Sequence, residues 1–360
     1  MIKVNINLKE RSYPIFITSG YGDLAKCMSS ARLSSRMVLI TDSNVDKFQA
    51  QECMEALKQG GFEIQKYIIP AGEKNKNLDN IRNIYKFLID LKLDRTATLI
   101  ALGGGVVGDM TGFAAATYLR GINFVQIPTS LLAQADSSVG GKVGVDFEGS
   151  KNIIGAFYQP KLVYMNMNSL KTLPERELRA GLAEVVKHGI IKDADYYDYI
   201  NYNIKKILSF DEDSLQYLAK VNCSIKGKIV EEDEKESDLR AILNFGHTIG
   251  HAIESVSNFE LLHGECVSLG MVGVFKMAQR LEMVSEDTVY SIMQTLKKIG
   301  LPVSLKGLDV EAVYKQMFYD KKVKNNKLLF VLPRRIGEVI QVNIDDENLI
   351  KQVLTELGEE

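Results

Sequence analysis

The chain has 360 residues, of which 46% are hydrophobic and 25% charged, and its formal net charge is −2. This composition predicts a globular protein of two domains, and so small a net charge gives no electrostatic reason to expect nucleic acid or an anionic membrane as a partner. The N-terminus lacks a signal-peptide pattern, no apolar run is long enough to cross a bilayer, and the four cysteines show no Cys-x-x-Cys spacing. We therefore expect a cytoplasmic protein without a disulfide framework or a thiolate zinc site.

Strand patterns alternate with helix patterns in the first half of the chain. Apolar and polar residues alternate from Ile2 to Leu8, which predicts a half-buried strand, and residues 13–18 could pair with it as a hairpin. An amphipathic helix that ends at Gly60-Gly61 and a helical spacing from Leu78 to Leu88 lie between later strands. Those strands are predicted at residues 37–41, 62–69, 98–102, 122–127 and 162–165. This alternation predicts a mostly parallel sheet with helices on both faces.

Helical patterns dominate after about residue 174. They cover residues 182–191, 215–232, 242–256, 266–281 and 289–299. One exception is the segment 327–342, which could form a hairpin. We therefore predict an α/β domain over residues 1–174 and an all-α domain over residues 175–360.

A glycine-rich turn, Gly103 to Asp109, follows the strand predicted at 98–102. Glycines between a strand and a helix let backbone amides approach a phosphate at the positive helix N-terminus. Strand ends at Asp42 and at residues 70–76 would converge on the same crevice, where Asp42 could bind ribose hydroxyls. The turn follows a later strand than the first and lacks the lysine of a nucleotide-triphosphatase loop, so a tight turn without a ligand is the alternative.

Three of the four histidines fall in one short stretch, at 247, 251 and 263. His247 and His251 are four residues apart and would share a helix face, while His263 lies near the start of the next helix and could return to the first. Thr248 stands where a metalloprotease has its glutamate, which excludes that class. A catalytic zinc site uses three protein ligands, so a carboxylate could complete this one. The alternative is a set of hydrogen-bonded core histidines.

The glycines beside these histidines, at 246, 250 and 264, are expected to let the backbone approach a ligand closely.

Two charged segments each allow a functional and a structural interpretation. Residues 136–152 are interpreted as a long loop whose lysines and glycines could bind an anion, or as a solvated surface loop. Glu184 and Lys187 share a helix face in an apolar segment, as a structural ion pair or as the source of the missing carboxylate.

These blocks together resemble the 3-dehydroquinate synthase family. The resemblance runs through essentially the whole chain and rests on residues 103–109, 136–142, 151–152, 183–187, 243–254 and 263–265. It implies an N-terminal Rossmann-like domain that binds NAD+, a C-terminal helical domain that binds Zn²⁺ or Co²⁺, an active site between them, and a homodimer. The implied metal ligands are Glu184, His247 and His263, whereas His251 would contact the substrate.

The resemblance also implies the other site residues. The cofactor would contact Asp42, Asn44, Glu73, Lys76, Gly104, Gly105, Val106, Asp109, Thr129, Ser130, Leu132, Lys142, Lys151 and Thr172. The substrate phosphate would be bound by Arg120, Lys142, Asn152 and His251, and the substrate carboxylate by Lys226 and Arg240. Asn244 would also bind substrate, and the catalytic set would be Asp136, Lys142, Lys187, Glu236 and His251. Either Lys321 or Lys322 would reach the phosphate.

The implied activity is that of a carbon–oxygen lyase of the shikimate pathway. It converts the anionic sugar phosphate 3-deoxy-D-arabino-heptulosonate 7-phosphate into 3-dehydroquinate and phosphate, through transient oxidation by NAD+, phosphate elimination, re-reduction and cyclisation. The alternatives are a related cyclase such as 2-deoxy-scyllo-inosose synthase, a metal-dependent polyol dehydrogenase, and a non-catalytic metabolite sensor. Lys226 with Arg240 argues against the cyclase, whose substrate has no carboxylate.

Overall fold

A computed structural model describes residues 1–236, 239–257, 260–318 and 327–359. The chain divides into two compact units. The first comprises Met1–Pro174 and Glu212–Glu231, and the second comprises Glu175–Asp211 and Glu232–Glu360. Each unit is described by itself below.

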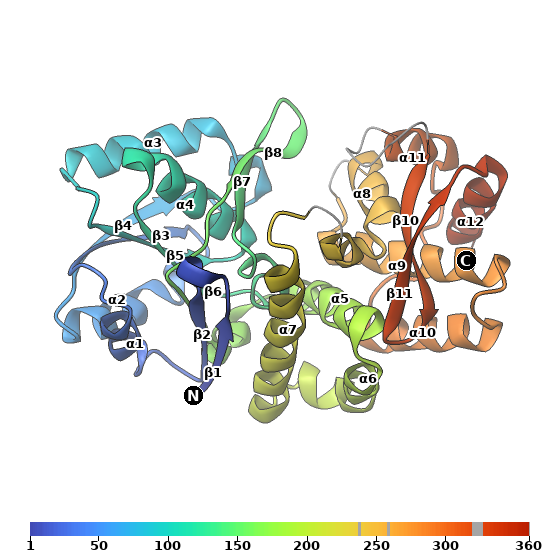
Figure 1. The fold of residues 1–360 in the computed structure, drawn as a ribbon, viewed down its shortest axis with the longest axis horizontal. Helices are drawn as coiled ribbons and strands as arrows, with labels where there is room; N and C mark the ends of the chain where they lie inside the picture. The colour runs from blue at the N-terminus through green and yellow to red at the C-terminus, as the bar shows by residue number, and fades with distance from the viewer. Residues whose placement is uncertain (237–238, 258–259, 319–326, 360) are drawn as a thin grey trace. The chain divides into compact units, whose positions relative to one another are not determined.

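The first unit is built on a seven-stranded sheet (Figure 1). Its strands are β1 (Ile2–Ile6), β2 (Tyr13–Thr18), β3 (Arg36–Asp42), β4 (Glu63–Ile69), β5 (Thr98–Gly103), β6 (Asn123–Pro128) and β9 (Leu162–Asn166), in the spatial order β1-β2-β9-β6-β5-β3-β4. β1 and β2 pair as an antiparallel hairpin, and all other neighbours are parallel, as predicted. Every residue of the interior strand β5 is buried, which explains its continuous apolar run, whereas the edge strand β4 is half exposed.

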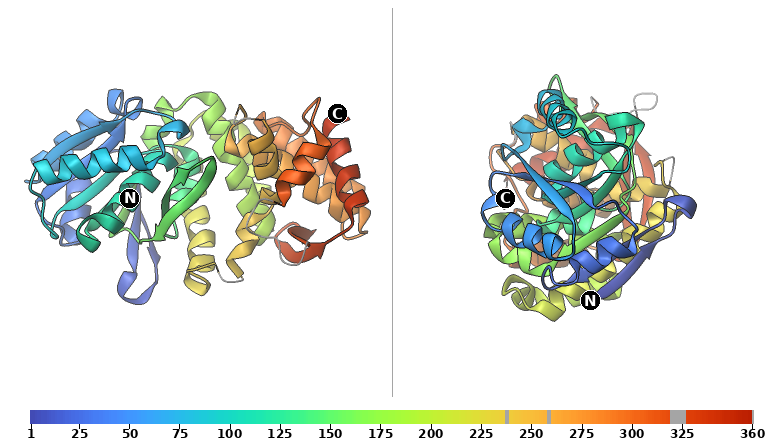
Figure 2. Two further views of the ribbon diagram at one scale, coloured as in Figure 1. Left: turned by 90° about the horizontal axis from the view of Figure 1, so that it is seen from above. Right: turned by 90° about the vertical axis from the view of Figure 1, so that its left-hand side faces the viewer.

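Helices cover both faces of this sheet, as Figures 1 and 2 show. The helices are α1 (Leu24–Ser30), α2 (Ala50–Gln59), α3 (Leu78–Asp90) and α4 (Gly105–Thr117). α1 and α2 pack with one set of sheet residues in a hydrophobic core, and α3 and α4 pack with the other set. α3 begins after Asn77, whose side chain accepts a hydrogen bond from the backbone amide of Asn80. The α/β prediction for this part of the chain is confirmed.

The segment expected to be a long loop contains regular structure, so that expectation was wrong. A π-helical turn, Ala133–Ser137, precedes an antiparallel hairpin of β7 (Lys142–Phe147) and β8 (Ser150–Phe157). Val143 and Val145 of β7 are buried in the core that contains α4. Gly144 separates these two valines and hid the alternating pattern of the strand.

The first unit also contains most of α7 (Glu212–Glu232), which differs from the single boundary predicted at residue 174. Cys223 on this helix lies 4.0 Å from the sulfur of Met165 in β9, and a Cβ on Gly227 would lie 2.6 Å from Ile6 in β1. α7 therefore packs on the sheet through contacts that join residues far apart in the sequence, which local periodicity does not reveal.

The second unit is mainly helical. Its helices are α5 (Glu175–Lys192), α6 (Ala194–Leu208), α8 (His247–Val256), α9 (His263–Arg280), α10 (Glu286–Ile299), α11 (Val310–Met317) and α12 (Glu347–Glu359). α9 is buried along almost its whole length and contacts α5, α8, α10 and α12. The hairpin expected at 327–342 is present as β10 (Leu328–Arg335) and β11 (Glu338–Ile344). α6, α11 and α12 were not predicted.

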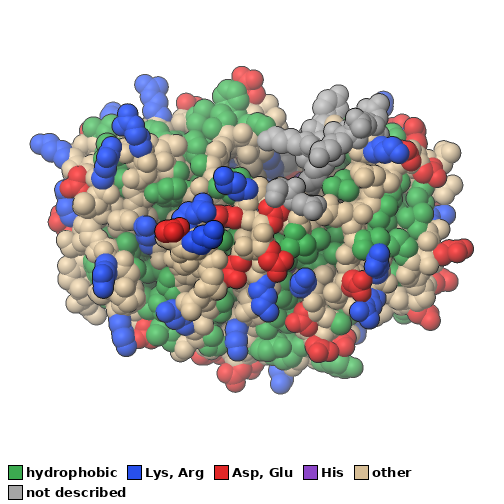
Figure 3. Space-filling view, in the orientation of Figure 1, with side chains coloured by type: hydrophobic (Ala, Val, Ile, Leu, Met, Phe, Trp, Pro, Cys, Tyr) green, Lys and Arg blue, Asp and Glu red, His purple; other side chains and the backbone are tan. Residues whose placement is uncertain are grey.

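The surface charges, the cysteines and the length of the helices can be compared with what the composition predicts. On the face drawn in Figure 3, Lys and Arg side chains are interspersed with Asp and Glu. The four cysteines are buried and form no disulfide in this structure. Within the described residues, no helix is both long and apolar enough to span a membrane.

Candidate active site

The order of the strands defines one crevice at the edge of the sheet. β4 lies on one side of β3, whereas β5, β6 and β9 lie on the other, so the chain reverses its direction of winding at β3 and β5. Ligands of doubly wound sheets bind at the carboxyl ends of the strands beside such a reversal. Asp42 ends β3, and the glycine-rich turn follows β5.

The glycine-rich turn leads directly into a helix. Gly104 precedes the first residue of α4, Gly105, in an ordinary extended conformation with φ of −75°. A Cβ on Gly104 would lie 3.4 Å from the hydroxyl of Ser130, and one on Gly105 would lie 3.3 Å from that of Ser137. Backbone amides at a helix N-terminus and two nearby hydroxyls suit a pyrophosphate.

Asp42 is held in a fixed orientation beside this turn. Its Oδ1 atom accepts hydrogen bonds from the backbone amides of Asn44 and Val45, at 2.8 and 3.1 Å. Carboxylates at this place in such sheets bind ribose hydroxyls. The geometry therefore agrees with the role expected for Asp42.

Lys76 connects three of the elements around the crevice. Its ammonium group lies 2.6 Å from Asp109 Oδ2 on α4 and also donates a hydrogen bond to Asn152 on β8. Burial lowers the pKa of Lys76, but Asp109 and Glu73 outweigh this and leave that pKa raised. Burial raises the pKa of Asp109, and Lys76 only partly offsets it. Asn152, expected at the substrate phosphate, thus shares a partner with the expected cofactor residues.

The other expected cofactor residues also follow strands of the same sheet or belong to the β7–β8 hairpin. Thr129 follows β6 and donates its backbone amide to the carbonyl of Gly103, at 3.0 Å. Thr172 follows β9 and accepts a hydrogen bond from Gln49, at 3.1 Å. Lys151 lies 3.8 Å from Glu73. All fourteen residues expected at the cofactor therefore belong to the first unit.

The first unit also contains three further residues expected at the substrate or in catalysis, Arg120, Asp136 and Lys226, besides Lys142 and Asn152. Lys226 on α7 lies 2.8 Å from the carboxylate of Asp136 and donates to its backbone carbonyl at 2.5 Å. Arg120 and Lys142 are exposed. The structure therefore joins Lys226 to Asp136 and places Arg120 and Lys142 at the surface.

A cluster of polar side chains lies inside the second unit. Both His247 Nε2 and His263 Nε2 lie 3.5 Å from the same oxygen of Glu184, Oε1. The ring centroids of His247, His251 and His263 are 5.1 to 5.7 Å apart. Lys187 forms an ion pair with the other oxygen of Glu184, Oε2. The structure therefore brings together the three histidines and the charged pair that the sequence had suggested separately.

Glycines bring these side chains together by allowing helices to pack closely. A Cβ on Gly270 of α9 would clash with the carbonyl oxygen of Gly246 before α8, and one on Gly264 would clash with that of Ala180 on α5. A Cβ on Gly250 would lie 2.9 Å from the carbonyl oxygen of Cys266. The expectation that Gly246, Gly250 and Gly264 let the backbone approach a ligand is thus corrected: these glycines contact neighbouring helices.

Two of the three proposed ligands, Glu184 and His247, have protonation states that suit metal ligation. Burial raises the pKa of Glu184, but Lys187, His263 and His247 outweigh it and hold that pKa well below its usual range. Burial and Lys187 lower the pKa of His247 well below its usual range. Burial lowers the pKa of His263, but Glu184 and Glu254 outweigh it and raise that pKa to about 9. Glu184 is therefore ionised and His247 neutral at pH 7, the forms that bind metals, whereas His263 is protonated and must release a proton when it binds one.

The donor set fits a divalent metal. Both oxygens of Glu184 are buried: Oε2 forms the ion pair with Lys187, and Oε1 faces the two imidazoles. The two histidine nitrogens face Glu184 at an ion-pair distance, longer than a hydrogen bond. Two imidazole nitrogens and one carboxylate oxygen are a ligand set of catalytic zinc sites. One nitrogen of each of the three histidines also lies within 4.8 Å of the others, so His251 stands next to the same place.

The remaining expected residues of the second unit form two local groups. Asn244 donates a hydrogen bond to Glu236, at 3.0 Å. Arg240 is buried and donates to the carbonyl of Glu234, at 2.6 Å. Lys321 and Lys322 lie outside the described residues. Glu254, which faces His263 Nδ1 at 3.7 Å, was not singled out in the sequence, although its spacing of seven residues from His247 placed it on the same helix face.

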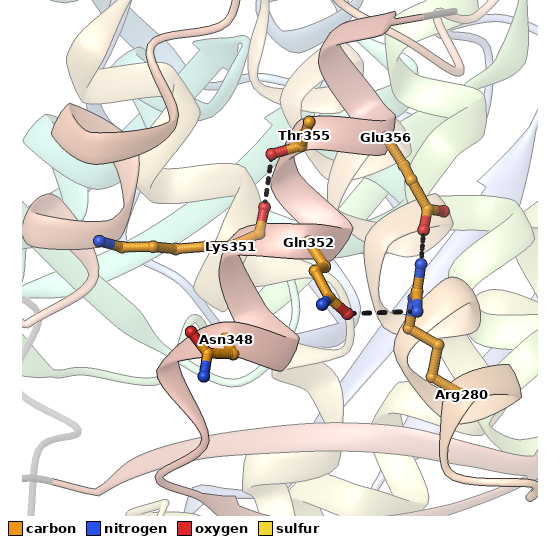
Figure 4. A pocket seen from close by; sticks show the side chains of 6 residues that line it. All are labelled: Arg280, Asn348, Lys351, Gln352, Thr355 and Glu356. Carbon is orange, nitrogen blue, oxygen red and sulfur yellow. Dashed lines mark hydrogen bonds and ion pairs between the residues drawn. The ribbon is translucent and has the colours of Figure 1, made fainter.

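A separate hollow of about 350 Å³ lies on the second unit (Figure 4). Its lining consists of Arg280, Asn348, Lys351, Gln352, Thr355 and Glu356. Arg280 at the end of α9 is bonded to Gln352 and Glu356 of α12. These contacts join two helices, and none of the candidate site residues lines the hollow.

Comparison with known proteins agrees with this arrangement. The family described as 3-dehydroquinate synthase N-terminal matches residues 66–180, and the 3-dehydroquinate synthase C-terminal family matches residues 181–323. A 3-dehydroquinate synthase from Acetivibrio thermocellus is 70% identical over the full length of both chains.

Two solved structures share the fold. One is 2-epi-5-epi-valiolone synthase from Streptomyces hygroscopicus subsp. jinggangensis with NAD+ and Zn²⁺ bound (26% identity, 98% of each chain covered, TM-score 0.90). The other is 2-deoxy-scyllo-inosose synthase with carbaglucose-6-phosphate, NAD+ and Co²⁺ (25% identity, 99% of this chain and 100% of that chain covered, TM-score 0.88). The family matches and the full-length identity together show that the chain belongs to the 3-dehydroquinate synthase family.

Proposed function

We propose that the chain converts 3-deoxy-D-arabino-heptulosonate 7-phosphate into 3-dehydroquinate and phosphate, with NAD+ as cofactor and a divalent metal bound by Glu184, His247 and His263. The observation that carries this proposal is the convergence of both histidine Nε2 atoms on one buried oxygen of Glu184. The bound NAD+ and metals of the two cyclase structures support the cofactor assignment.

The first unit would hold the cofactor. The backbone amides of Gly104 and Gly105 at the start of α4 would bind the pyrophosphate, and Asp42 would accept hydrogen bonds from the ribose. The ion pair of Lys76 and Asp109 would fix the segment that follows β4 against α4 beside the bound cofactor. These groups are ordered by contacts within the protein, which reduces the conformational entropy lost on binding.

The second unit would hold the metal. Glu184 contributes a negative charge, which Lys187 partly balances, and the two imidazoles contribute neutral nitrogen ligands. When both groups are bound, NAD+ would supply a reversible hydride acceptor and the metal a Lewis acid at the oxygen of the oxidised carbon. Zn²⁺ and Co²⁺ both suit these ligands.

The substrate carries a phosphate and a carboxylate, and the chain has cationic groups for both. Arg120, Lys142, Asn152 and His251 would bind the phosphate, and Lys226 and Arg240 the carboxylate. Asp136 holds Lys226 in place through the 2.8 Å ion pair. Asn244 and Glu236, already hydrogen-bonded to each other, would contact the hydroxyl groups that take part in ring closure.

His251 and Lys187 would assist the chemistry at the reacting carbons. Elimination breaks the C–O bond to phosphate, the leaving phosphate would take the proton from the adjacent carbon, and His251 beside that phosphate would orient it. Lys187 is almost fully buried beside Glu184, where its charge would favour an ionised substrate hydroxyl. Because the reaction has no net redox change, NAD+ is needed only in catalytic amount.

The test is phosphate release from the heptulosonate phosphate with far less NAD+ than substrate. We expect many turnovers per NAD+, loss of activity after chelation, and recovery after Co²⁺ or Zn²⁺ is added. NADH that accumulates in proportion to product would contradict the cyclase assignment and indicate a dehydrogenase. Retention of full activity after complete metal removal, verified by elemental analysis, would contradict the metal requirement.

A further inference from the structure

Each of the two histidines that face Glu184 turns its second ring nitrogen toward an acceptor. His247 Nδ1 lies 3.0 Å from the backbone carbonyl of Phe245. His263 Nδ1 lies 3.7 Å from Oε2 of Glu254, an ion-pair distance. Both rings therefore have the same orientation pattern, with Nε2 toward Glu184 and Nδ1 toward an oxygen.

This pattern matters because a neutral histidine has one proton and two ring nitrogens. When Nε2 is a metal ligand, the proton stays on Nδ1, and an acceptor for it fixes both the tautomer and the angle of the ring. For His247 that acceptor belongs to the backbone, two residues away. For His263 the acceptor is the side chain of Glu254, which lies on a different helix.

His263 has more need of such an acceptor than His247. It is the first residue of α9, so no preceding helical turn packs against it, and its side chain is 30% exposed compared with 10% for His247. Glu254 lies near the end of α8 with its side chain only 6% exposed. A buried carboxylate costs free energy unless charged or polar groups compensate it, so its position beside the His263 ring indicates a specific use.

We propose that Glu254 is a positioning residue that accepts the Nδ1 proton of His263 and thereby holds Nε2 toward the metal. This inference rests on the proposed metal site and assigns a function to a residue that is neither a ligand nor a substrate contact. Because α8 also supplies His247, one helix would position both histidine ligands. The expected effect of losing Glu254 is weaker metal binding, with the ligands themselves unchanged.

The test measures Co²⁺ binding to the full-length, chelator-treated protein by competition with a chromophoric chelator. We expect Glu254→Ala to raise the dissociation constant for Co²⁺ about 10- to 100-fold, the range typical for loss of such a partner. Glu254→Gln keeps an acceptor oxygen without the charge, so its dissociation constant should fall between the two. The visible spectrum of bound Co²⁺ should also change in Glu254→Ala, because the ring of His263 is less constrained.

Thr248→Val is the matched control. Thr248 is buried on α8 and donates a hydrogen bond to the carbonyl of Leu329, so its replacement perturbs the packing of the same helix without touching the histidines. Thr248→Val should bind Co²⁺ like the wild type. Equal weakening of Co²⁺ binding in Thr248→Val and Glu254→Ala would overturn the inference about Glu254, and so would unchanged Co²⁺ binding in both glutamate variants. Neither result would contradict the proposed metal site. Wild-type protein that binds no Co²⁺ would overturn the metal assignment itself. If Glu254→Ala fails to fold, Glu254→Gln carries the comparison.

Discussion

Lys187 and Glu184 form an ion pair one turn apart on α5, and their side chains are only 1% and 0% exposed. Two such buried charges balance each other, but their pairing does not by itself repay the cost of removing both from water. The pair is therefore better explained by the proposed metal site than by stability. Lys187 compensates the carboxylate while no cation is bound.

This relationship predicts a metal-dependent stability defect in Lys187→Met. Without metal, Glu184 would lose its ammonium partner inside the protein, and the free energy of unfolding should fall by about 3 kcal/mol. Bound Co²⁺ supplies positive charge at the same carboxylate and stabilises the folded state through binding. Calorimetry should therefore show a larger drop in Tm for the chelator-treated variant than for the Co²⁺-loaded one.

The control for this prediction is the double variant Lys187→Met with Glu184→Gln. Removing both charges should restore much of the Tm of the metal-free protein, since no unpaired charge is left buried. The same variant should not bind Co²⁺. An unchanged Tm in metal-free Lys187→Met would show that Glu184 does not depend on Lys187.

The histidines should separate into two classes when metal content is measured. A site with three protein ligands has none to spare, so His247→Ala and His263→Ala should lose bound metal. His251→Ala should retain most of it and lose activity instead, because we assign His251 to the substrate phosphate. Elemental analysis of the purified proteins after dialysis distinguishes the classes. Equal metal loss in His251→Ala would make the three-histidine set, rather than Glu184 with two histidines, the better assignment.

Local patterns in the sequence predict most of the first unit. The strands and the β1–β2 hairpin depend on alternation or apolar runs within a few residues, and these survive folding. The β7–β8 hairpin was missed because Gly144 interrupts the two valines of β7. α6, between Ala194 and Leu208, was missed because tyrosine, isoleucine and asparagine have modest helix propensity, and its helical state depends on tertiary packing.

The candidate site, too, could be predicted from the sequence only in part. The spacing of His247 and His251 and the N-terminal position of His263 on its helix were readable from neighbouring residues. The contact of Glu254 with His263 depends on how α8 and α9 meet, which in turn depends on close packing at Gly246 and Gly270. Such long-range contacts leave no periodic signal in one sequence. They explain why the ligands could be suggested but their supporting residue could not.

The packing of α8 on α9 predicts that Gly270, which is not a ligand itself, controls the geometry of the metal site. In Gly270→Ala the new methyl group would overlap the carbonyl oxygen of Gly246, which is backbone and cannot turn aside. The helices must separate, and we expect a loss of roughly 1–3 kcal/mol in the free energy of unfolding together with weaker Co²⁺ binding. Denaturant titration and Co²⁺ titration measure the two effects.

Gly273→Ala on the same helix is the matched control for this packing. Its methyl group would lie 2.6 Å from Cδ1 of Ile249, the end of a side chain that can adopt another rotamer. The loss of stability should be smaller, and Co²⁺ affinity should be close to that of the wild type. Equal Co²⁺ affinity in both variants would mean that the spacing of α8 and α9 does not set the ligand geometry.

Replacing Gly104 should show whether this glycine is needed for cofactor binding or only for the backbone turn. Its φ of −75° suits any residue, and a Cβ would meet Ser130 at 3.4 Å, an ordinary contact, so Gly104→Ala should fold with nearly unchanged Tm. If the NAD+ pyrophosphate approaches the backbone here, the methyl group takes its space, and the dissociation constant for NAD+ should rise about tenfold, or ~1.4 kcal/mol. The chain has no tryptophan, so titration calorimetry is the suitable measurement. Gly22→Ala, where a Cβ meets nothing within 4 Å, is the control and should leave NAD+ binding unchanged. Unchanged NAD+ affinity in Gly104→Ala would assign this glycine to the turn alone and move the pyrophosphate away from the start of α4.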